Sequence, residues 1–567
     1  MKHVRFWAMG LAMTVGAAAF AQTPVPPKQK VGFDSITVDE LKKDLYYVAS
    51  DEMEGRLSLQ PGDEKAIHWV EEQFRAAGLK PAATDAAGKP SYLQAVPLIE
   101  FAPDRASVRV SLQRGGKETA WALPKAGVGF KHAVDITAPV VFAGFGITAP
   151  EFGYDDYAGL DVKGKIVLIF DHEPQEDDAH SRFNGTGNTR YATSRVKVLN
   201  AQRHGALAVL IVAEPNRKHL TNAERYARIG GSAARVKPLP VQMIADDEVK
   251  IPLGMVLDDV AKTLFEGSGT TPGEAQTAID RDLKPQSRAL VDAVLTLHSK
   301  NLYEHEGTTY NVVALLPGSD AKLAQETVII SAHHDHDGIS PCADEKHPPV
   351  QVPADPHPCP QIWHGADDNG SGTVGVVALA RAFAANPAKP KRSILFSVFA
   401  SEERGLLGAY WMAAHPLRPL AGTKAQINFD MIGRDETASP QTDGLIEIPK
   451  DTTNRLNLVG ALYSPEYDRE VKEANKSVGL VLDDRFDHES ALNVLFRSDQ
   501  FPFLLHDIPA LWWFTGFHPD YHHTTDTADK IDYVKMRKIL ELAYLSTWKF
   551  GTEAKTPEFK ATLMPVR

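Results

Sequence analysis

The stretch SAHHDHDG, residues 331–338, follows the apolar run TVII and places three histidines and two aspartates in five consecutive positions. Imidazole and carboxylate groups bind metal ions and carry protons, so this composition suits metal-dependent or acid–base chemistry. A histidine tract on the protein surface would not need to follow a buried strand. The stretch therefore predicts a chemical site at the carboxyl end of a strand.

Residues of the same kind follow the other apolar runs in the last part of the chain. Taken singly, each group has a plain structural interpretation, such as a capped helix start or an exposed acidic pair. In an α/β sheet, however, ligands bind where the carboxyl ends of the strands meet, so together the groups predict one site. Its candidates are His333 and Asp335 after TVIISA, Glu402 and Glu403 after SILFSVFAS, Asp430 after QINF, Asp367 and Asp368 ahead of a helix that begins near Gly372, and Tyr521, His522 and Asp526 after PALWWFTGFHPD.

The chemistry of this set favours zinc. Two histidines and three or four carboxylates, without a thiolate, suit Zn²⁺ and, less well, Mn²⁺. Two neighbouring cations need a carboxylate that bridges them, and such a pair activates water and polarises a carbonyl group. One carboxylate must stay off the metals to carry a proton, and the adjacent Glu402 and Glu403 offer one group for each role.

The elements that must position these residues can be predicted from periodicity. The chain has 567 residues, 43% apolar and 24% charged, which is enough for two or more domains. Helical periodicity marks residues 38–56 and 62–81, and short β-type runs with one helix at 194–206 fill the segment from about 106 to 284. After 285, continuous apolar strands alternate with helices. This alternation predicts an α/β fold with a mixed, mostly parallel sheet sandwiched by helices.

The N-terminus has the layout of a secretory signal peptide. Lys2 and Arg5 precede an apolar run at 6–20, and small residues end before Gln22. Residues 1–21 are therefore predicted to be cleaved, since the run is short for a membrane span; an uncleaved anchor is the alternative. We expect an exported protein, periplasmic or secreted, with no transmembrane segment after cleavage. The net charge of −12, without a basic run, argues against nucleic acid as a partner.

The chain has only two cysteines, Cys342 and Cys359, and both lie in one proline-rich loop. In an oxidising compartment this pair predicts a disulfide that closes the loop. Two free thiols are the alternative. A cysteine-based zinc site is disfavoured, because the pair lacks the short spacing of such sites.

Five motifs resemble, in their order along the chain, those of the co-catalytic zinc exopeptidases of metallopeptidase family 28: AHHDHDG, GADDNGSG, SEERGLLGA, NFDMIGR and YHHTTDTADKI. This family includes aminopeptidases, glutamate carboxypeptidases and some non-peptidase relatives. The resemblance extends to SDEMEGR and EEQFRAAGLKP near the start, and the middle segment resembles a protease-associated domain. It implies a zinc peptidase domain at 22–105 and 285–567, interrupted by a β-rich protease-associated insert at 106–284.

The resemblance also implies roles for single residues, with two zinc ions per chain and Mn²⁺ or Co²⁺ as substitutes. Glu402 would be the general base, and Asp335 would orient a metal-bound imidazole. No role is implied for His334, His336, Asp367 or His523. The implied ligands are His333 and Asp430 for the first zinc, Asp368 bridging both ions, and Glu403 and His522 for the second zinc.

The function that follows is an exported exopeptidase, an aminopeptidase that releases N-terminal residues from peptides or proteins through a zinc-bound hydroxide. A carboxypeptidase is the near alternative, in which Arg434 or Arg497 would bind a substrate carboxylate; either arginine could instead be structural. A metal-free binding ectodomain and a single-zinc transferase are disfavoured by the full ligand set. The sequence leaves the oligomeric state open, and the loop at 338–364 either narrows the cleft or lies on the surface.

Overall fold

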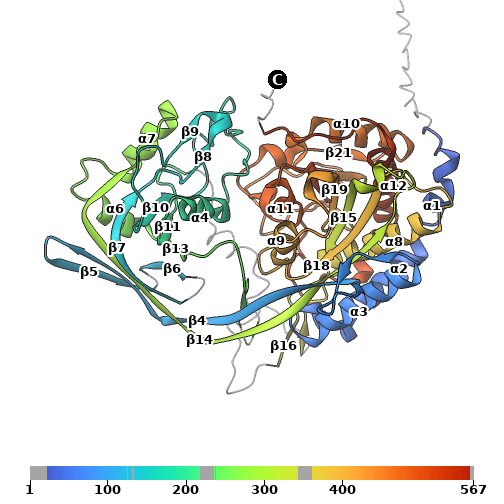
Figure 1. Ribbon diagram of the computed structural model, residues 1–567, viewed down its shortest axis with the longest axis horizontal. Coiled ribbons are helices and arrows are strands. Elements are labelled where there is room, and N and C mark those ends of the chain that lie inside the picture. Colours follow the sequence, from blue (N-terminus) through green and yellow to red (C-terminus); the bar gives the residue numbers. More distant parts are fainter. Residues whose placement is uncertain are drawn as a thin grey trace, which may run out of the picture.

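The computed structural model describes residues 22–561, except 124, 131–132, 218–234, 236–237 and 343–359. The predicted signal peptide at 1–21 therefore lies outside the described residues. The chain forms two lobes, joined by a pair of long strands (Figure 1).

The larger lobe is built on a mixed sheet. Its strand order is β21 (Val481–Asp483), β20 (Arg455–Val459), β22 (Ala510–Phe514), β19 (Thr423–Phe429), β15 (Thr327–His333), β18 (Ser393–Phe399) and β14 (Arg288–Leu316). The four central strands β22, β19, β15 and β18 are parallel to one another. The contacts of β20 with β22 and of β14 with β18 are antiparallel. The predicted mixed, mostly parallel sheet is confirmed.

Both faces of this sheet are covered, as the continuous apolar strands predict. Along β15, Val328 and Ile330 pack into one apolar core and Ile329 packs into another, because successive side chains of a strand point to opposite faces. The first core includes residues of α2 (Val38–Val48), α3 (Pro61–Ala76), α8 (Gly372–Ala385) and α12 (Tyr533–Thr552). The second includes residues of α9 (Leu407–Ala414) and α11 (Gln500–Leu504).

The predicted helix at 38–56 is shorter than its periodicity suggested. α2 ends at Val48, and a separate 3₁₀ turn spans Asp51–Arg56. Glu54 and Gly55 inside that turn have φ values of 51° and 65°, which lie in the left-handed region and cannot continue a right-handed helix.

The two lobes are connected by a two-stranded antiparallel ribbon. β4 (Leu93–Arg114) pairs with β14 from Leu93 opposite Val312 to Gln113 opposite Val294. Both strands span the two lobes, β4 running towards the smaller lobe and β14 back towards the larger one (Figure 1). β4 passes position 106 without interruption, and β14 begins shortly after position 284. The predicted domain boundaries at 105/106 and 284/285 thus lie in or next to a continuous ribbon. No finding tests these boundaries, so they remain predictions.

The smaller lobe has its own parallel strands and apolar core. β7 (Val134–Phe142), β10 (Ile166–Phe170), β11 (Ala208–Val212) and β13 (Leu253–Val256) are parallel neighbours, with α4 (Ser194–Arg203), α6 (Asp258–Phe265) and α7 (Pro272–Asp282) beside them. One strand, β12 (Val241–Ile244), instead pairs with β4 at Leu98–Phe101 of the ribbon.

The loop that carries the cysteines is closed at its base by a short antiparallel pair, β16 (Ile339–Ser340) with β17 (Gln361–Ile362). Cys342 is disulfide-bonded. Cys359, the other residue of the predicted pair, lies outside the described residues. Among the residues that the structure describes, no helix has the length and apolar character needed to cross a membrane.

Candidate functional site

Three neighbouring parallel strands bring the first group of candidate ligands to one edge of the sheet. β15 ends at His333, β19 ends just before Asp430, and β18 ends shortly before Glu402. The segment Ala366–Ser371, ahead of α8, adds Asp368. His333 Nε2 lies 3.5 Å from Asp368 Oδ1, 3.5 Å from Asp430 Oδ1 and 3.7 Å from Glu402 Oε2.

A second group lies on the other side of Asp368. His522 Nε2 is 3.0 Å from Asp368 Oδ2 and 3.1 Å from Glu403 Oε2. Asp368 therefore faces one histidine with each of its two carboxylate oxygens. Ligand atoms about 2.1 Å from a tetrahedral ion lie about 3.4 Å apart, so both groups have the dimensions of a metal site.

One ring nitrogen of His333 makes a hydrogen bond, and the other is left to bind a metal ion. His333 Nδ1 lies 3.2 Å from the backbone oxygen of Asp335, whereas His333 Nε2 is buried and makes no hydrogen bond. The Asp335 carboxylate lies 3.7 Å from the imidazole and accepts hydrogen bonds from the backbone N–H groups of Glu402 and Glu403, at 2.9 and 3.2 Å. Asp335 thus ties the first ligand to the turn that carries the two glutamates.

The adjacent glutamates have opposite electrostatic environments. Burial, together with the negative charge of Asp430, raises the pKa of Glu402 well above its usual value. Burial would also raise the pKa of Glu403, but His522 and His336 outweigh it and hold that pKa well below its usual value. Two carboxyl groups whose pKa values are pushed apart are suited to different tasks: one to hold a proton and one to stay charged.

The remaining residues of HHDHD are all buried and all engaged, although the sequence implied no role for them. His336 Nδ1 lies 2.6 Å from Glu403 Oε1. The Asp337 carboxylate lies 3.7 Å from His522 Nδ1 and accepts a hydrogen bond from Arg404 at 2.6 Å. His334 Nε2 donates to a backbone oxygen of β14, which is a structural contact. The sequence offers one signal for these contacts, which is that the three residues stand directly beside the predicted ligand His333 and its partner Asp335.

Two buried charged residues that sequence reasoning did not assign hold the ligand segments in place. The guanidinium of Arg56 donates to the backbone oxygens of Val48, His334, His364 and Gly365 at 2.7–2.9 Å. Burial lowers its pKa to about 10.

The second of these residues is Asp526, whose carboxylate accepts hydrogen bonds from the backbone N–H groups of Asp367 and Asp368 at 2.9–3.1 Å. The sequence places Asp526 among the candidates for the site, but the resemblance implies no role for it. Asp367 itself accepts from the Gly433 N–H at 2.7 Å and lies 3.2 Å from His518, so it has a structural environment.

A cleft opens beside the two groups of ligands. Besides the acidic residues and His522, it is lined by Met431, Arg497, Trp512, Phe517 and Tyr521. The Arg497 guanidinium lies 5.1 Å from the centre of the Phe517 ring and donates to the Tyr521 hydroxyl at 3.2 Å.

The two arginine candidates are separated by the fold. Arg497 lines the cleft, whereas Arg434 forms an ion pair with Asp520 at 2.9 Å and is not among the lining residues.

The end of the cysteine-containing loop also reaches the site, because Trp363 Nε1 donates to the backbone oxygen of His522 at 3.2 Å. Most of that loop lies outside the described residues.

Comparison with known proteins gives two family matches. Residues 311–546 match the model of peptidase family M28, and residues 136–264 match that of the PA domain. The first match covers every residue of the two groups of candidate ligands. The second lies within the predicted insert.

The similar curated proteins match only in part. A "probable zinc metalloprotease" of Pyrenophora teres f. teres is 38% identical over 112 residues, 18% of this chain and 24% of its own length. "Leucine aminopeptidase 2" of Trichophyton equinum is 28% identical over 223 residues, 39% of this chain and 36% of its own length. The chain thus spans less than two fifths of either relative. Among solved structures, an aminopeptidase from Aneurinibacillus sp. strain AM-1 is 19% identical, with a TM-score of 0.46, and the match covers 95% of this chain and 98% of that one.

Proposed function

The chain belongs to peptidase family M28 and carries a PA domain, and on that premise we propose that it is a zinc-dependent aminopeptidase that releases N-terminal residues from peptides or proteins. The observation that carries the proposal is the position of Asp368, with one carboxylate oxygen near each of two histidines and a further acidic ligand beside each histidine.

The residues present fit two zinc ions. Imidazole and carboxylate donors without thiolate suit zinc, and a buried His333 Nε2 without a hydrogen bond is a donor atom in need of a partner. His333, Asp368 and Asp430 would hold one ion, and Asp368, Glu403 and His522 the other. When bound, the ions would polarise the scissile carbonyl group and lower the pKa of the attacking water. Mn²⁺ or Co²⁺ could substitute.

Glu402 is proposed as the general base. Its carboxylate lies in the cleft, 3.7 Å from His333 Nε2, and is assigned to neither ion. It would take the proton of the attacking water and pass it to the leaving amine. Asp335 would act as a positioning residue, since it holds both His333 and the turn with Glu402 and Glu403.

The cleft supports an exopeptidase. Beside the ligand groups and Glu402, it is lined by the apolar and aromatic side chains of Met431, Trp512, Phe517 and Tyr521, which can contact the terminal side chain of a peptide. The features at 1–21 support export to the periplasm or the exterior. The acidic net charge supports peptide partners over nucleic acid.

A carboxypeptidase is the second candidate, and Arg497 favours it because it places a cation in the same cleft. Arg497→Gln should then reduce cleavage of peptides with a free C-terminal carboxylate at least tenfold more than cleavage of their C-terminal amides. Arg434→Gln is the matched control, since that arginine lies outside the lining.

The test is mass spectrometry of a peptide mixture incubated with zinc-loaded protein that begins at Gln22. Each peptide is present in free, N-acetylated and C-amidated form, and Glu402→Gln protein serves as the control. Stepwise loss from free N-termini, with acetylated peptides intact, supports an aminopeptidase. Shortening from the other end supports the carboxypeptidase, and no cleavage in any form contradicts both.

A further inference from the structure

Gln242 belongs to the smaller lobe by sequence but makes its side-chain hydrogen bonds with the larger lobe and the ribbon. Its Nε2 donates to the backbone oxygen of Ser58 at 3.2 Å and to Glu100 Oε2 at 2.9 Å. Its Oε1 accepts a hydrogen bond from the Ser401 hydroxyl at 3.3 Å. The side chain is buried. The two acceptors fix the orientation of the amide, so its oxygen faces Ser401.

The strand that carries Gln242 is docked firmly. β12 pairs antiparallel with β4, which places Ile244 opposite Leu98. Ile244 and Leu98 pack in one apolar cluster with Leu407, the first residue of α9. Arg195 of α4 lies 4.0 Å from the centre of the Tyr410 ring on the same helix. The smaller lobe therefore contacts α9, which begins just after the turn that carries the two glutamates.

Ser401 precedes Glu402 and has an unfavourable backbone conformation. Its φ of 53° lies in the left-handed region, which is unfavourable for a non-glycine residue unless its surroundings hold it. On one side, Asp335 accepts from the N–H groups of the next two residues. On the other side, the Ser401 hydroxyl donates to Gln242, and its backbone oxygen accepts from the Leu407 N–H at 3.1 Å.

We propose that Gln242 is a positioning residue for the reaction, through which the PA-domain lobe completes the catalytic site. The proposal rests on the function proposed above. Without the amide oxygen, Ser401 loses one of the contacts that hold its left-handed conformation. The turn then relaxes, and Glu402 and Glu403 move away from the other ligands.

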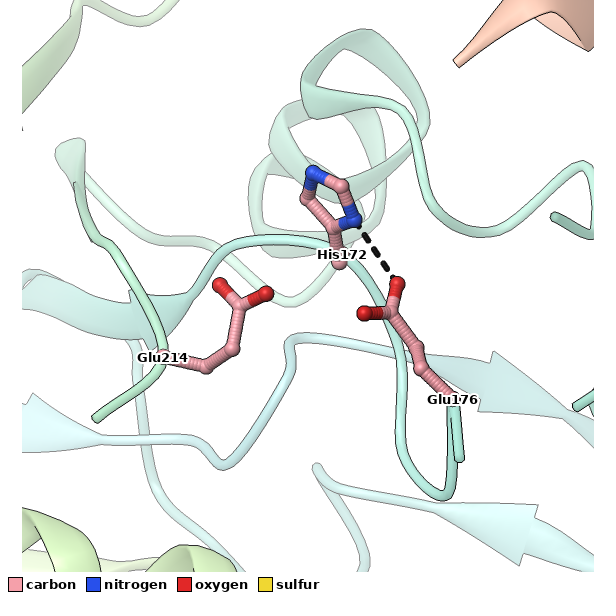
Figure 2. Close-up of side chains that lie close together, drawn as sticks. All are labelled: His172, Glu176 and Glu214. Atoms are coloured by element: carbon pink, nitrogen blue, oxygen red, sulfur yellow. Dashed lines mark hydrogen bonds and ion pairs between the residues drawn. The ribbon is translucent and has the colours of Figure 1, made fainter. Parts of the chain in front are cut away.

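A second hydrogen bond also joins the two lobes. His172, Glu176 and Glu214 of the smaller lobe offer ligand atoms within 4.8 Å of one another, and Figure 2 shows His172 directed at Glu176. His172 Nδ1 lies 2.7 Å from Glu176 Oε1, and its Nε2 lies 3.3 Å from Asn493 Nδ2 of the larger lobe. An imidazole with its proton on Nδ1 makes both hydrogen bonds, donating to Glu176 and accepting from Asn493. These contacts connect the two lobes and give the imidazole a structural role. Asn493 lies four residues before Arg497 of the cleft.

The experiment compares Gln242→Ala with Gln276→Ala in the full mature protein. Gln276 is the matched control, because it is a buried glutamine of the same lobe whose side-chain oxygen accepts from the Asn216 N–H at 2.8 Å, inside that lobe. For each variant we would measure kcat, KM, the thermal unfolding midpoint and the zinc dissociation constant by chelator competition.

Gln242→Ala should lower kcat and weaken zinc binding by about tenfold each, as loss of a partner behind a metal ligand commonly does, with KM changed less than twofold. Gln276→Ala should match wild type in kcat and zinc affinity, even if both variants unfold at a lower temperature. Ser401→Ala removes the other partner of the same bond. The double variant should therefore be no slower than the slower single variant.

A kcat and zinc affinity for Gln242→Ala within twofold of those for Gln276→Ala would overturn the proposal. Additive losses in the double variant would also overturn it. If the wild-type protein cleaves no peptide, the proposed function fails, and zinc affinity alone then decides the role of Gln242: an unchanged dissociation constant refutes it, and a weakened one supports it.

Discussion

Replacement of Arg56 by methionine should both destabilise the larger lobe and loosen the metal site. Arg56 is fully buried and makes four hydrogen bonds to backbone oxygens. Two of these oxygens belong to His334 and Gly365, next to or near the ligands His333 and Asp368. Methionine matches the length of the arginine stem but donates no hydrogen bond, so Arg56→Met leaves all four oxygens without this partner.

The magnitude follows from that count. A hydrogen bond to a charged group contributes about 1.5–3 kcal/mol, so four give a gross loss of about 6–12 kcal/mol. Relief of the cost of burying the guanidinium offsets part of this loss. Removing one partner of a buried charged network typically costs about 3–5 kcal/mol net. At about 2.1 cal/mol/K per residue, the roughly 370 residues of the larger lobe unfold with an entropy of about 0.8 kcal/mol/K, so 4 kcal/mol corresponds to a fall of roughly 5 °C in the unfolding midpoint.

The assay is thermal unfolding of the zinc-loaded and the chelator-treated protein, with zinc per chain measured by mass spectrometry. Arg392→Met is the matched control. Arg392 is also buried and donates to Glu326 and to the backbone oxygens of Phe550 and Glu553, away from the ligands. Both variants should unfold earlier, but only Arg56→Met should bind zinc more weakly.

Two results would refute this reasoning. A midpoint for Arg56→Met within about 2 °C of wild type would mean that the four backbone oxygens find other partners at no cost. Equal zinc affinity in the two arginine variants would mean that Arg56 supports the fold without organising the ligand segments.

The remaining predictions concern the site and the acid stability of the fold. Glu402→Gln should keep both zinc ions and lower kcat by about 10²–10⁴, the usual contribution of a general base; turnover like that of wild type in a steady-state assay removes it from that role. His522→Ala should leave one tightly held zinc per chain by mass spectrometry, and two would contradict its assignment as a ligand. Burial would raise the pKa of Asp520, but hydrogen bonds from Lys530 and other neighbours lower it to about 2, below the ordinary 3.8. Its stabilising contribution is therefore complete above about pH 4 and is lost as the pH falls towards 2. The midpoint difference between wild type and Asp520→Asn should accordingly shrink from about pH 5 to pH 3, and a constant difference would count against this ion pair.

Much of the candidate site could be predicted from sequence because its residues follow apolar runs directly. His333 ends a buried strand and Asp430 follows the next parallel one, so the parallel arrangement itself brings them together. Asp335 and Glu402 could be paired in the same way, since their strands are neighbours. Strand direction, which the alternation of strands and helices predicts, is sufficient for this part because the carboxyl ends of parallel strands lie at one edge of the sheet, whereas the order of the strands came from the structure.

The residues that support the site could not be found in this way. Arg56 contacts segments about 280 and 310 positions further along the chain, and no local pattern distinguishes it from a surface arginine. The break after α2 was missed for a related reason: the helical periodicity continues through residues whose backbone turns left-handed to place Arg56.

The sequence by itself determined the class of fold, which strands are followed by ligand-type residues and the kind of metal those residues suit, because periodicity and donor chemistry are local properties. Only the tertiary structure decided how Asp368 faces two histidines, why Glu402 and Glu403 have opposite pKa shifts, and that Gln242 lies behind their turn. These properties depend on burial and on distances between segments far apart in the chain. The pairing of β12 with β4, one strand of the long ribbon, places Gln242 beside that turn.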